Sequence, residues 1–312
     1  MPSGVGMPPE RVPQVRPAPV DISCVNPLDH YIDRVKTLPP APRTLTQLLL
    51  VLRQEDVPAA RVVELIRFDA ALTARILQRC NSAAFGFKEP AHDILDALIR
   101  IGFNDIYRMA ATIVAETTLA GALPGYGLQN GDLWQHSVVV AVSARLLARN
   151  IGSDENLAFT GGILHDIGKI VLSGALAQAD ASVQPERQTS AGCFADRDKR
   201  LLGVGHAELG GRLLERWGFP DNLIGAVSYH HDPLQADTHA RLAACIYLGN
   251  VAANLMGYGP AQAADKLQAR PEVLQFLGIP AEDVELLMSQ TDAALETLNW
   301  FARKPMVATS LG

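Results

Sequence analysis

Apolar residues recur at helical spacing through most of the chain from Pro42 onward. Val62, Leu65 and Ile66, for example, fall on one face of a helix with about 3.6 residues per turn. Alternating apolar and polar positions, which would indicate half-buried strands, are scarce. The pattern therefore predicts an all-α protein.

Capping residues and helix breakers divide this pattern into segments. Asp69 stands where a helix N-cap is expected, Gly102 where a helix should end, and Asn104 where the next should begin. The run from Leu123 to Gly131 is rich in breakers and separates a first helical group from a second. Beyond it, the period predicts helices over residues 133–150, 154–172, 206–217, 220–230, 238–256 and 281–298.

These boundaries predict four parts of the chain. Residues 1–29 form a proline-rich tail that we expect to be disordered. Residues 30–123 form the first helical part, residues 131–257 a second helical core, and residues 258–312 a C-terminal helical extension. Residues 178–192 are polar and lack a helical period, so we expect a loop or a lid there.

Composition narrows the classes of function. The net charge of -6 is spread without a large basic face, which argues against direct binding to DNA. The most apolar central stretch, residues 138–147, is interrupted by Arg145 and is too short for a bilayer, so we expect no membrane anchor. The cysteines form no CxxC pair, which fits reduced thiols in a cytoplasmic protein. They are Cys24, Cys80, Cys193 and Cys245.

Residues able to bind a metal ion gather in the second helical group. The chain has 8 histidines, and most of them belong to this set. Neutral imidazoles and a carboxylate suit iron, manganese, nickel or zinc. The candidate ligands are His136, His165, Asp166, His206, His230 and His231.

The segment around His165 and Asp166 carries further features. The pattern places both residues on one helix, where neighbours point about 100° apart, so they would share a metal only at a helix edge. Gly161 and Gly162 predict that neighbouring helices approach closely here. Lys169 lies one turn beyond His165 and could hold a phosphate oxygen or a carboxylate, or be solvated.

Polar side chains of the first helical group allow two interpretations. Their guanidinium groups could grip a partner or an anionic ligand. Alternatively, the arginines form salt bridges with Asp69, Asp93, Asp96 or Asp105, and this interpretation is favoured. The side chains concerned are Arg75, Arg79, Asn81, Arg100 and Arg108.

Short phrases along the chain resemble the HD superfamily of metal-dependent phosphohydrolases. The order of the histidines is like that of the HD-GYP branch, which hydrolyses cyclic di-GMP with two metals, and the HDOD family of bacterial signalling output domains is a closer match. The resemblance runs from about residue 30 to 255 and implies an HD-domain-like helical bundle with an N-terminal helical subdomain. The phrases are residues 38–42 (LPPAP), 69–77 (DAALTARIL), 81–86 (NSAAFG), 134–137 (WQHS), 161–169 (GGILHDIGK), 206–210 (HAELG) and 217–220 (WGFP).

Two departures from the phosphohydrolase pattern bear on the chemistry. Where the resemblance implies a metal-binding aspartate on a later helix, this sequence has Asn250, a weak neutral ligand. No Gly-Tyr-Pro motif follows the histidine pair, where residues 232–234 read DPL. Asp166, His206, His230 and His231 could still hold one ion rather than two. The alternative is that these side chains hydrogen-bond to one another without a metal.

Three functions remain in competition. The favoured one is a regulatory protein of bacterial signalling, which binds signalling proteins or a nucleotide ligand through a degenerate HD site. The second is a metal-dependent phosphohydrolase acting on a nucleotide or cyclic dinucleotide, with Asp166 and Lys169 as its catalytic residues. The third is a non-catalytic sensor of a nucleotide or metal. The sequence leaves the oligomeric state open.

Overall fold

The computed structural model describes residues 27–35, 40–54, 56–182, 194–259 and 268–298. These residues are largely helical and contain no β-strand; their one isolated bridge joins Leu123 to Leu128. The all-α prediction is confirmed. No helix among the described residues has both the length and the apolar character needed to cross a bilayer.

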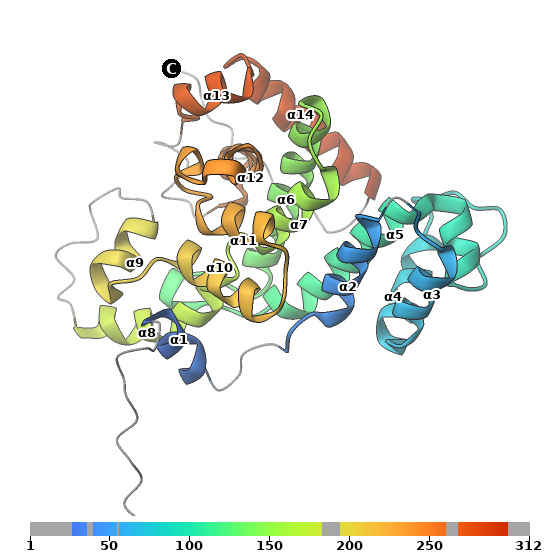
Figure 1. Cartoon of the computed structure of the whole chain (residues 1–312), viewed down its shortest axis with the longest axis horizontal. Coiled ribbons are helices and arrows are strands. Elements are labelled where there is room, and N and C mark those ends of the chain that lie inside the picture. The colour runs from blue at the N-terminus through green and yellow to red at the C-terminus, as the bar shows by residue number, and fades with distance from the viewer. Residues whose placement is uncertain (1–26, 36–39, 55, 183–193, 260–267, 299–312) are drawn as a thin grey trace, which may run out of the picture.

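The N-terminal half supplies a small lobe and one long helix. Figure 1 shows α2, α3 and α4 gathered beside the first part of α5, whereas α1 lies apart, against α8 and α10. The helices are α1 (Pro27–Arg34), α2 (Arg43–Leu52), α3 (Ala59–Arg67), α4 (Ala70–Cys80) and α5 (Ile94–Leu119).

Local chemistry sets the ends of these helices. Asp69 caps α4 as predicted, because its carboxylate accepts a hydrogen bond from the Leu72 amide at 2.9 Å. Gly102 has φ 82° and ψ 167°, a backbone conformation that favours glycine, and it kinks α5 where the sequence predicts a break. The second part of α5 then runs on toward the centre of the molecule and packs on α6 and α7.

The C-terminal half is built around α6, most of whose side chains are buried. Helices α7, α12 and α14 pack against it, and α8, α9, α10 and α11 complete the layer that holds the site (Figure 1). The elements are η2 (Pro124–Tyr126), α6 (Asp132–Asn150), α7 (Glu155–Leu164), α8 (Gly168–Ser182), α9 (Phe194–Leu202), α10 (His206–Arg216), α11 (Asp221–Ser228), η4 (Pro233–Gln235), η5 (Asp237–His239), α12 (Ala240–Ala253), η6 (Asn254–Tyr258), α13 (Pro271–Leu277) and α14 (Asp283–Leu298).

The helix predicted over residues 154–172 is wrong as a single element. It divides into α7 and α8, with His165, Asp166 and Ile167 in a turn between them. A Cβ on Gly168 would clash with the carbonyl oxygen of His206, so the start of α10 lies directly against the chain here. The divided helix places the histidine and the aspartate at a corner rather than on one helical face.

Two further predictions need correction. Gln178–Ser182, predicted to begin a loop or lid, forms the last turn of α8, since its alanine-rich sequence favours a helix; residues 183–192 lie outside the described residues. Residues 27–29, assigned to the disordered tail, form the first turn of α1, because Arg212 holds Asp29 through two hydrogen bonds. Residues 1–26 of the tail lie outside the described residues.

The predicted close approach of helices at the two glycines is present. A Cβ on Gly162 would lie 2.5 Å from the Cα of Ala141, so α6 and α7 touch backbone to backbone. A Cβ on Gly161 would instead clash with the tip of the Ile246 side chain. The contact at Gly162 fixes α7, and with it the turn that follows, against the central helix.

Candidate metal centre

Four separate segments bring the predicted ligands into one buried cluster. His136 projects from α6, His165 and Asp166 from the turn after α7, and His206 from the first position of α10. The pair His230 and His231 follows one residue after the end of α11. All of these side chains are buried except that of His231, which is half-buried.

Asp166 lies at the middle of the cluster. Its Oδ2 is 3.3 Å from the Nε2 of His165 and 3.7 Å from the Nε2 of His136. Its Oδ1 is 3.3 Å from the Nε2 of His206 and 3.9 Å from the Nε2 of His230. The carboxylate therefore has imidazole nitrogens on both of its oxygens, as a bridging ligand would.

The six candidate ligands form two compact groups, each with its ligand atoms within 4.8 Å of one another. One group is His136, His165 and Asp166, and the other is His206, His230 and His231. In the second group, the Nε2 atoms of His206 and His231 are only 2.9 Å apart. Two imidazole nitrogens at this distance need a proton or a cation between them.

Hydrogen bonds of the outer ring nitrogens fix the direction of the histidines. In four of the histidines Nδ1 faces an oxygen that only accepts, so it must carry a proton, and Nε2 faces inward. The bonds are His136 Nδ1 to Tyr258 O (3.0 Å), His165 Nδ1 to Gly162 O (2.8 Å), His230 Nδ1 to Val227 O (2.8 Å) and His206 Nδ1 to Asp198 Oδ2 (2.5 Å).

Three buried polar atoms at the centre have no hydrogen-bond partner among the described residues. They are the Nε2 atoms of His165 and His230 and the Oδ1 of Asp166. Leaving such atoms buried and unpaired is costly. A divalent cation held between imidazoles and a carboxylate would satisfy them, so the donor set fits a metal ion.

Electrostatics prepares the carboxylate for this role. Burial favours the neutral form of Asp166, but His165 and Lys169 outweigh it and hold the pKa of the carboxyl well below its usual range. Burial lowers the pKa of His136 to about 3, and nearby His165 adds to this effect. At neutral pH the cluster therefore contains an ionised carboxylate and a neutral His136.

The pKa values of the three histidines in the second group are shifted in opposite directions. Burial, followed by the charges of neighbouring histidines, lowers the pKa of His230 and of His231 well below the usual range, so both are neutral ligands. Burial acts in the same direction on His206, but the carboxylates of Asp166 and Asp198, one beside each ring nitrogen, outweigh it and raise its pKa. An ion at this group would have to displace a proton from His206 in competition with these carboxylates.

Lys169 is buried beside the carboxylate rather than solvated. Its Nζ lies 2.5 Å from the Oδ2 of Asp166 and 5.6 Å from the centre of the Tyr126 ring. The sequence allowed Lys169 a phosphate oxygen, a carboxylate or solvent as its partner, and in the structure the partner is the carboxylate of Asp166.

Asn250, predicted as a weak ligand, lies half-buried on α12. Its Oδ1 accepts a hydrogen bond from the Nδ2 of Asn254 at 2.7 Å. The position thus offers an uncharged amide that is already bonded to the first residue of η6.

The sequence analysis missed two polar residues at this site, Asp198 on α9 and Tyr126 in η2. Asp198 is fully buried and accepts hydrogen bonds from both His206 and Tyr126. The helix carrying Asp198 was not predicted, because its nine residues are highly charged. The available signal was an acidic residue eight positions before a candidate ligand.

A clamp connects the centre to the C-terminal extension. Arg270, just before α13, donates to the carbonyl oxygen of His231 at 2.8 Å and to Asp232 at 3.0 Å. Its guanidinium lies 4.8 Å from the centre of the Tyr247 ring on α12. The backbone that carries the second histidine of the pair is therefore held from outside by the extension.

The predicted arginine cluster forms salt bridges, as the favoured interpretation has it, although two of the arginines pair with an acidic residue that was not among the predicted partners. Arg100 pairs with Asp96 and Arg108 with Asp105. Arg75 and Arg79 both pair with Glu116, an acidic residue on α5 that the sequence analysis did not consider.

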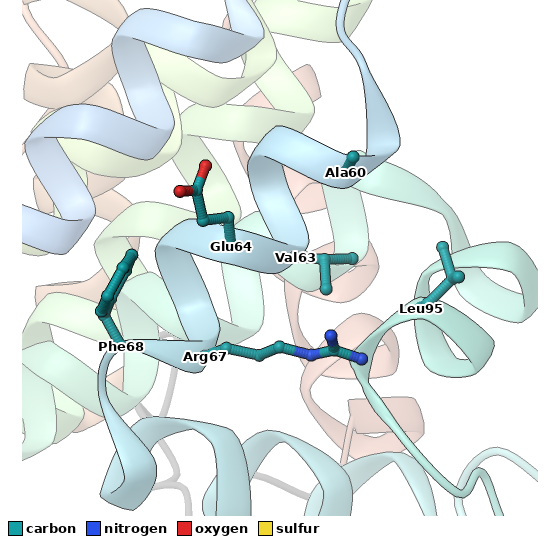
Figure 2. Close-up of a pocket in the computed structure, with 6 residues that line it drawn as sticks. All are labelled: Ala60, Val63, Glu64, Arg67, Phe68 and Leu95. Atoms are coloured by element: carbon teal, nitrogen blue, oxygen red, sulfur yellow. The ribbon is translucent and has the colours of Figure 1, made fainter.

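The N-terminal lobe carries an apolar groove, whose lining residues are distant in sequence from those of the metal centre. Figure 2 shows the lining residues of the groove, which come from α3, from Phe68 directly after it and from the start of α5. The cavity has a volume of about 410 Å³. Phe68 at its edge is 83% exposed, and Ile99, one turn beyond the lining residue Leu95, is 74% exposed. Large apolar side chains this exposed are typical of a contact surface.

The helical fold and the histidine–aspartate centre together define a protein of the HD-superfamily kind. The HDOD domain family matches residues 38–233, more than half of the chain. The chain therefore belongs to the HDOD family.

Curated relatives share only part of their length with this chain. A Treponema pallidum protein of undescribed function is 27% identical over 205 residues, which are 64% of this chain and 39% of the relative. Ribonuclease Y of Thermus thermophilus is 33% identical over 107 residues, which are 34% of this chain and 14% of the enzyme. The chain thus spans well under half the length of these relatives.

Solved structures share the fold. An HDOD domain protein of unknown function from Geobacter sulfurreducens superposes with a TM-score of 0.68 at 24% identity, covering 89% of this chain and 98% of that one. A candidate phosphohydrolase from Shewanella amazonensis gives a TM-score of 0.65 at 24% identity, with 88% and 98% covered. At these identities the similarity establishes the architecture alone.

Proposed function

We propose that this protein is a regulatory component of bacterial signalling, in which a degenerate HD centre binds one divalent ion and does not turn over a phosphoester. Residues 30–123 and 131–257 would serve as the two parts of one HDOD unit, with residues 258–312 as an extension. The observation that carries the proposal is the convergence of four inward-facing Nε2 atoms on the two oxygens of Asp166.

A single ion is favoured because the two ligand groups are unequal. His206, His230 and His231 can join the Oδ1 of Asp166 in a complete set of three imidazoles and a carboxylate. On the other side, the Lys169 ammonium already lies against Oδ2 and opposes a second cation. We assign Asn250 to that side by the resemblance to HD phosphohydrolases, and its amide would add no negative charge there. The ligand chemistry suits iron, manganese, nickel or zinc.

The burial of the site argues against turnover. His165 is 0% exposed, Asp166 1% and Lys169 8%, so a phosphate group has little access to the ligands. Lys169 is also neutralised by Asp166, which reduces its use for binding a phosphate. When bound, an ion would supply Lewis acidity. The surrounding residues would bury it, however, as is more typical of a structural or sensing ion than of a catalytic one.

Binding of other proteins is supported by the N-terminal lobe. Phe68, Leu95 and Ile99 present apolar surface next to the groove of Figure 2. The net charge of -6 continues to argue against DNA as a direct ligand. Signalling proteins are the partners that we propose, and a nucleotide is the alternative ligand.

A phosphohydrolase is the second candidate, because Lys169 lies within the same cluster as the candidate ligands, 2.5 Å from Asp166. If the centre opened and this ion pair separated, the two side chains could assist an attack on phosphorus. In that case these two residues would be catalytic.

Metal analysis combined with a phosphodiesterase assay tests the choice. We expect one equivalent of metal in the purified protein and no turnover of bis-p-nitrophenyl phosphate or cyclic di-GMP with manganese, iron, nickel or zinc. Asp166→Asn, which preserves side-chain size, should lose the metal while thermal unfolding shows that the fold is retained. Turnover that depends on metal and disappears in this variant would establish the enzyme instead.

A further inference from the structure

We propose that Asp198 is a positioning residue of the metal centre, which holds His206 in the one tautomer that can bind an ion. The inference rests on the proposed metal centre and adds to it a residue from a helix with no predicted role. Asp198 reaches the centre only through His206, and no contact joins it to the other ligands among the described residues.

The geometry of the contact is close and enclosed. The Oδ2 of Asp198 lies 2.5 Å from the Nδ1 of His206, and both side chains are 0% exposed. The hydroxyl of Tyr126 donates to the same oxygen at 2.9 Å. Two donors converging on one oxygen hold the carboxylate in place, so it can orient the imidazole ring closely enough to direct its lone pair.

The chemistry of the pair determines what His206 can do. An ionised carboxylate has no proton to give, so the Nδ1 of His206 must donate, and Nε2 is the nitrogen that can bind an ion once its own proton is displaced. That nitrogen faces the Oδ1 of Asp166 and the Nε2 of His231, at 3.3 and 2.9 Å. A carboxylate behind a ligating histidine also makes the imidazole a stronger ligand.

The other histidines lack this reinforcement. His136, His165 and His230 each direct Nδ1 to a neutral backbone carbonyl. His206 alone among these four has a charged partner, and it belongs to the group in which we place the ion. The difference strengthens the ligand field on one side of Asp166 only.

Substitution of Asp198 by Asn tests the role with little change in volume. The amide nitrogen can donate to Nδ1 and so favour the tautomer with a proton on Nε2, and in the other orientation the amide still lacks charge. We expect the affinity of the chelator-stripped full chain for Ni²⁺, measured by calorimetry, to fall about 10- to 100-fold.

The matched control is Glu208→Gln on α10. Glu208 pairs with Lys199 of α9 at 2.8 Å, so this variant also removes a carboxylate from the contact between α9 and α10, but away from His206. We expect its Ni²⁺ affinity to equal that of the wild type. Tyr126→Phe, which removes one donor and leaves the bond to His206, should lower the affinity less than Asp198→Asn.

A second measurement does not depend on metal. Long-range ¹H–¹⁵N spectra of the histidine rings in the metal-free protein should show the Nδ1 proton of His206 in the wild type and in Glu208→Gln, and an altered ring pattern in Asp198→Asn. An unaltered pattern would overturn the inference.

The outcomes separate the two proposals. A wild-type chain that binds no Ni²⁺ refutes the metal centre, whereas a wild-type chain that binds it no more tightly than Asp198→Asn refutes the role of Asp198 alone. If Glu208→Gln weakens binding as much as Asp198→Asn, the effect comes from the packing of α9, and the inference again fails.

Discussion

At the residue scale, the centre depends on which nitrogen of each imidazole carries the proton. Backbone carbonyls of α7, α11 and η6 accept from the outer nitrogens, so the inward nitrogens are free before any ion arrives. Lowered pKa values keep His136, His230 and His231 neutral, and a raised one makes His206 the exception. A preorganised set of this kind has little left to rearrange on binding.

Restoring a carboxylate at Asn250 tests whether missing charge limits the centre. We expect Asn250→Asp to bind Ni²⁺ more tightly than the wild type or to take up a second equivalent, because a carboxylate adds a charged ligand. The measurement is metal content after dialysis against a fixed concentration of Ni²⁺.

The control for this prediction is Asn104→Asp. It makes the same change at an amide whose Oδ1 accepts from Asn156, on the contact between α5 and α7. Unaltered metal content in Asn250→Asp would show that position 250 does not contribute to the site.

At the element scale, the ends of helices position the chemistry. The order of the histidines in the sequence predicted which residues meet in the cluster, and three of them, His136, His165 and His206, stand in short phrases that are informative by themselves. Asp198 could not be predicted in this way, because its helix is short and highly charged and its partner His206 is recognised only in three dimensions. The turn at His165 was not predicted either, because the apolar pattern continues through it. The close packing of Gly168 on α10, which accompanies the break in the helix, is seen only in the structure.

Substitution of Gly162 tests the contact that seats this turn. We expect Gly162→Ala to lower the free energy of unfolding by about 1–3 kcal/mol, because the added methyl meets the backbone of α6. Gly174 on α8 is the control, since it is exposed and nothing lies within 4 Å of the point that an added methyl would occupy. Gly174→Ala should raise the free energy of unfolding by about 0.5–1 kcal/mol. Urea unfolding measures both, and equal effects would refute the contact.

At the scale of the whole molecule, an ion pair connects parts of the chain that are distant in sequence. Asp29 on α1 pairs with Arg212 on α10, 183 residues away, and α1 thereby covers the core of the second half. The groove of the small N-terminal lobe, by contrast, has an exposed Phe68 at its edge (Figure 2). One half of the molecule is thus closed around its polar centre, and the other presents apolar surface.

The pairing of Asp29 predicts a dependence of stability on pH. The hydrogen bond and charge of Arg212 lower the pKa of Asp29 in the folded protein, although burial opposes them. Its stabilisation is therefore fully present above the unfolded-state pKa of about 3.9 and is lost as the pH falls through the folded-state pKa. Asp29→Asn should unfold at lower urea than the wild type at neutral pH, and the difference should close in acid.

The exposed pair of Arg61 and Glu64 provides the comparison. Glu64→Gln should hardly alter the urea midpoint at any of these pH values, because such pairs contribute little. A constant difference between wild type and Asp29→Asn down to the acid limit would contradict the assignment.

The clamp at Arg270 has a mechanical consequence. Its guanidinium holds the main chain of His231 while its own backbone begins α13, outside the segment shared with the family. Separation of α13 from the body therefore requires the bond between Arg270 and the His231 carbonyl to break. In the metal centre that we propose, an ion held by His231 would oppose this separation, and displacement of α13 would weaken binding of the ion by the same factor.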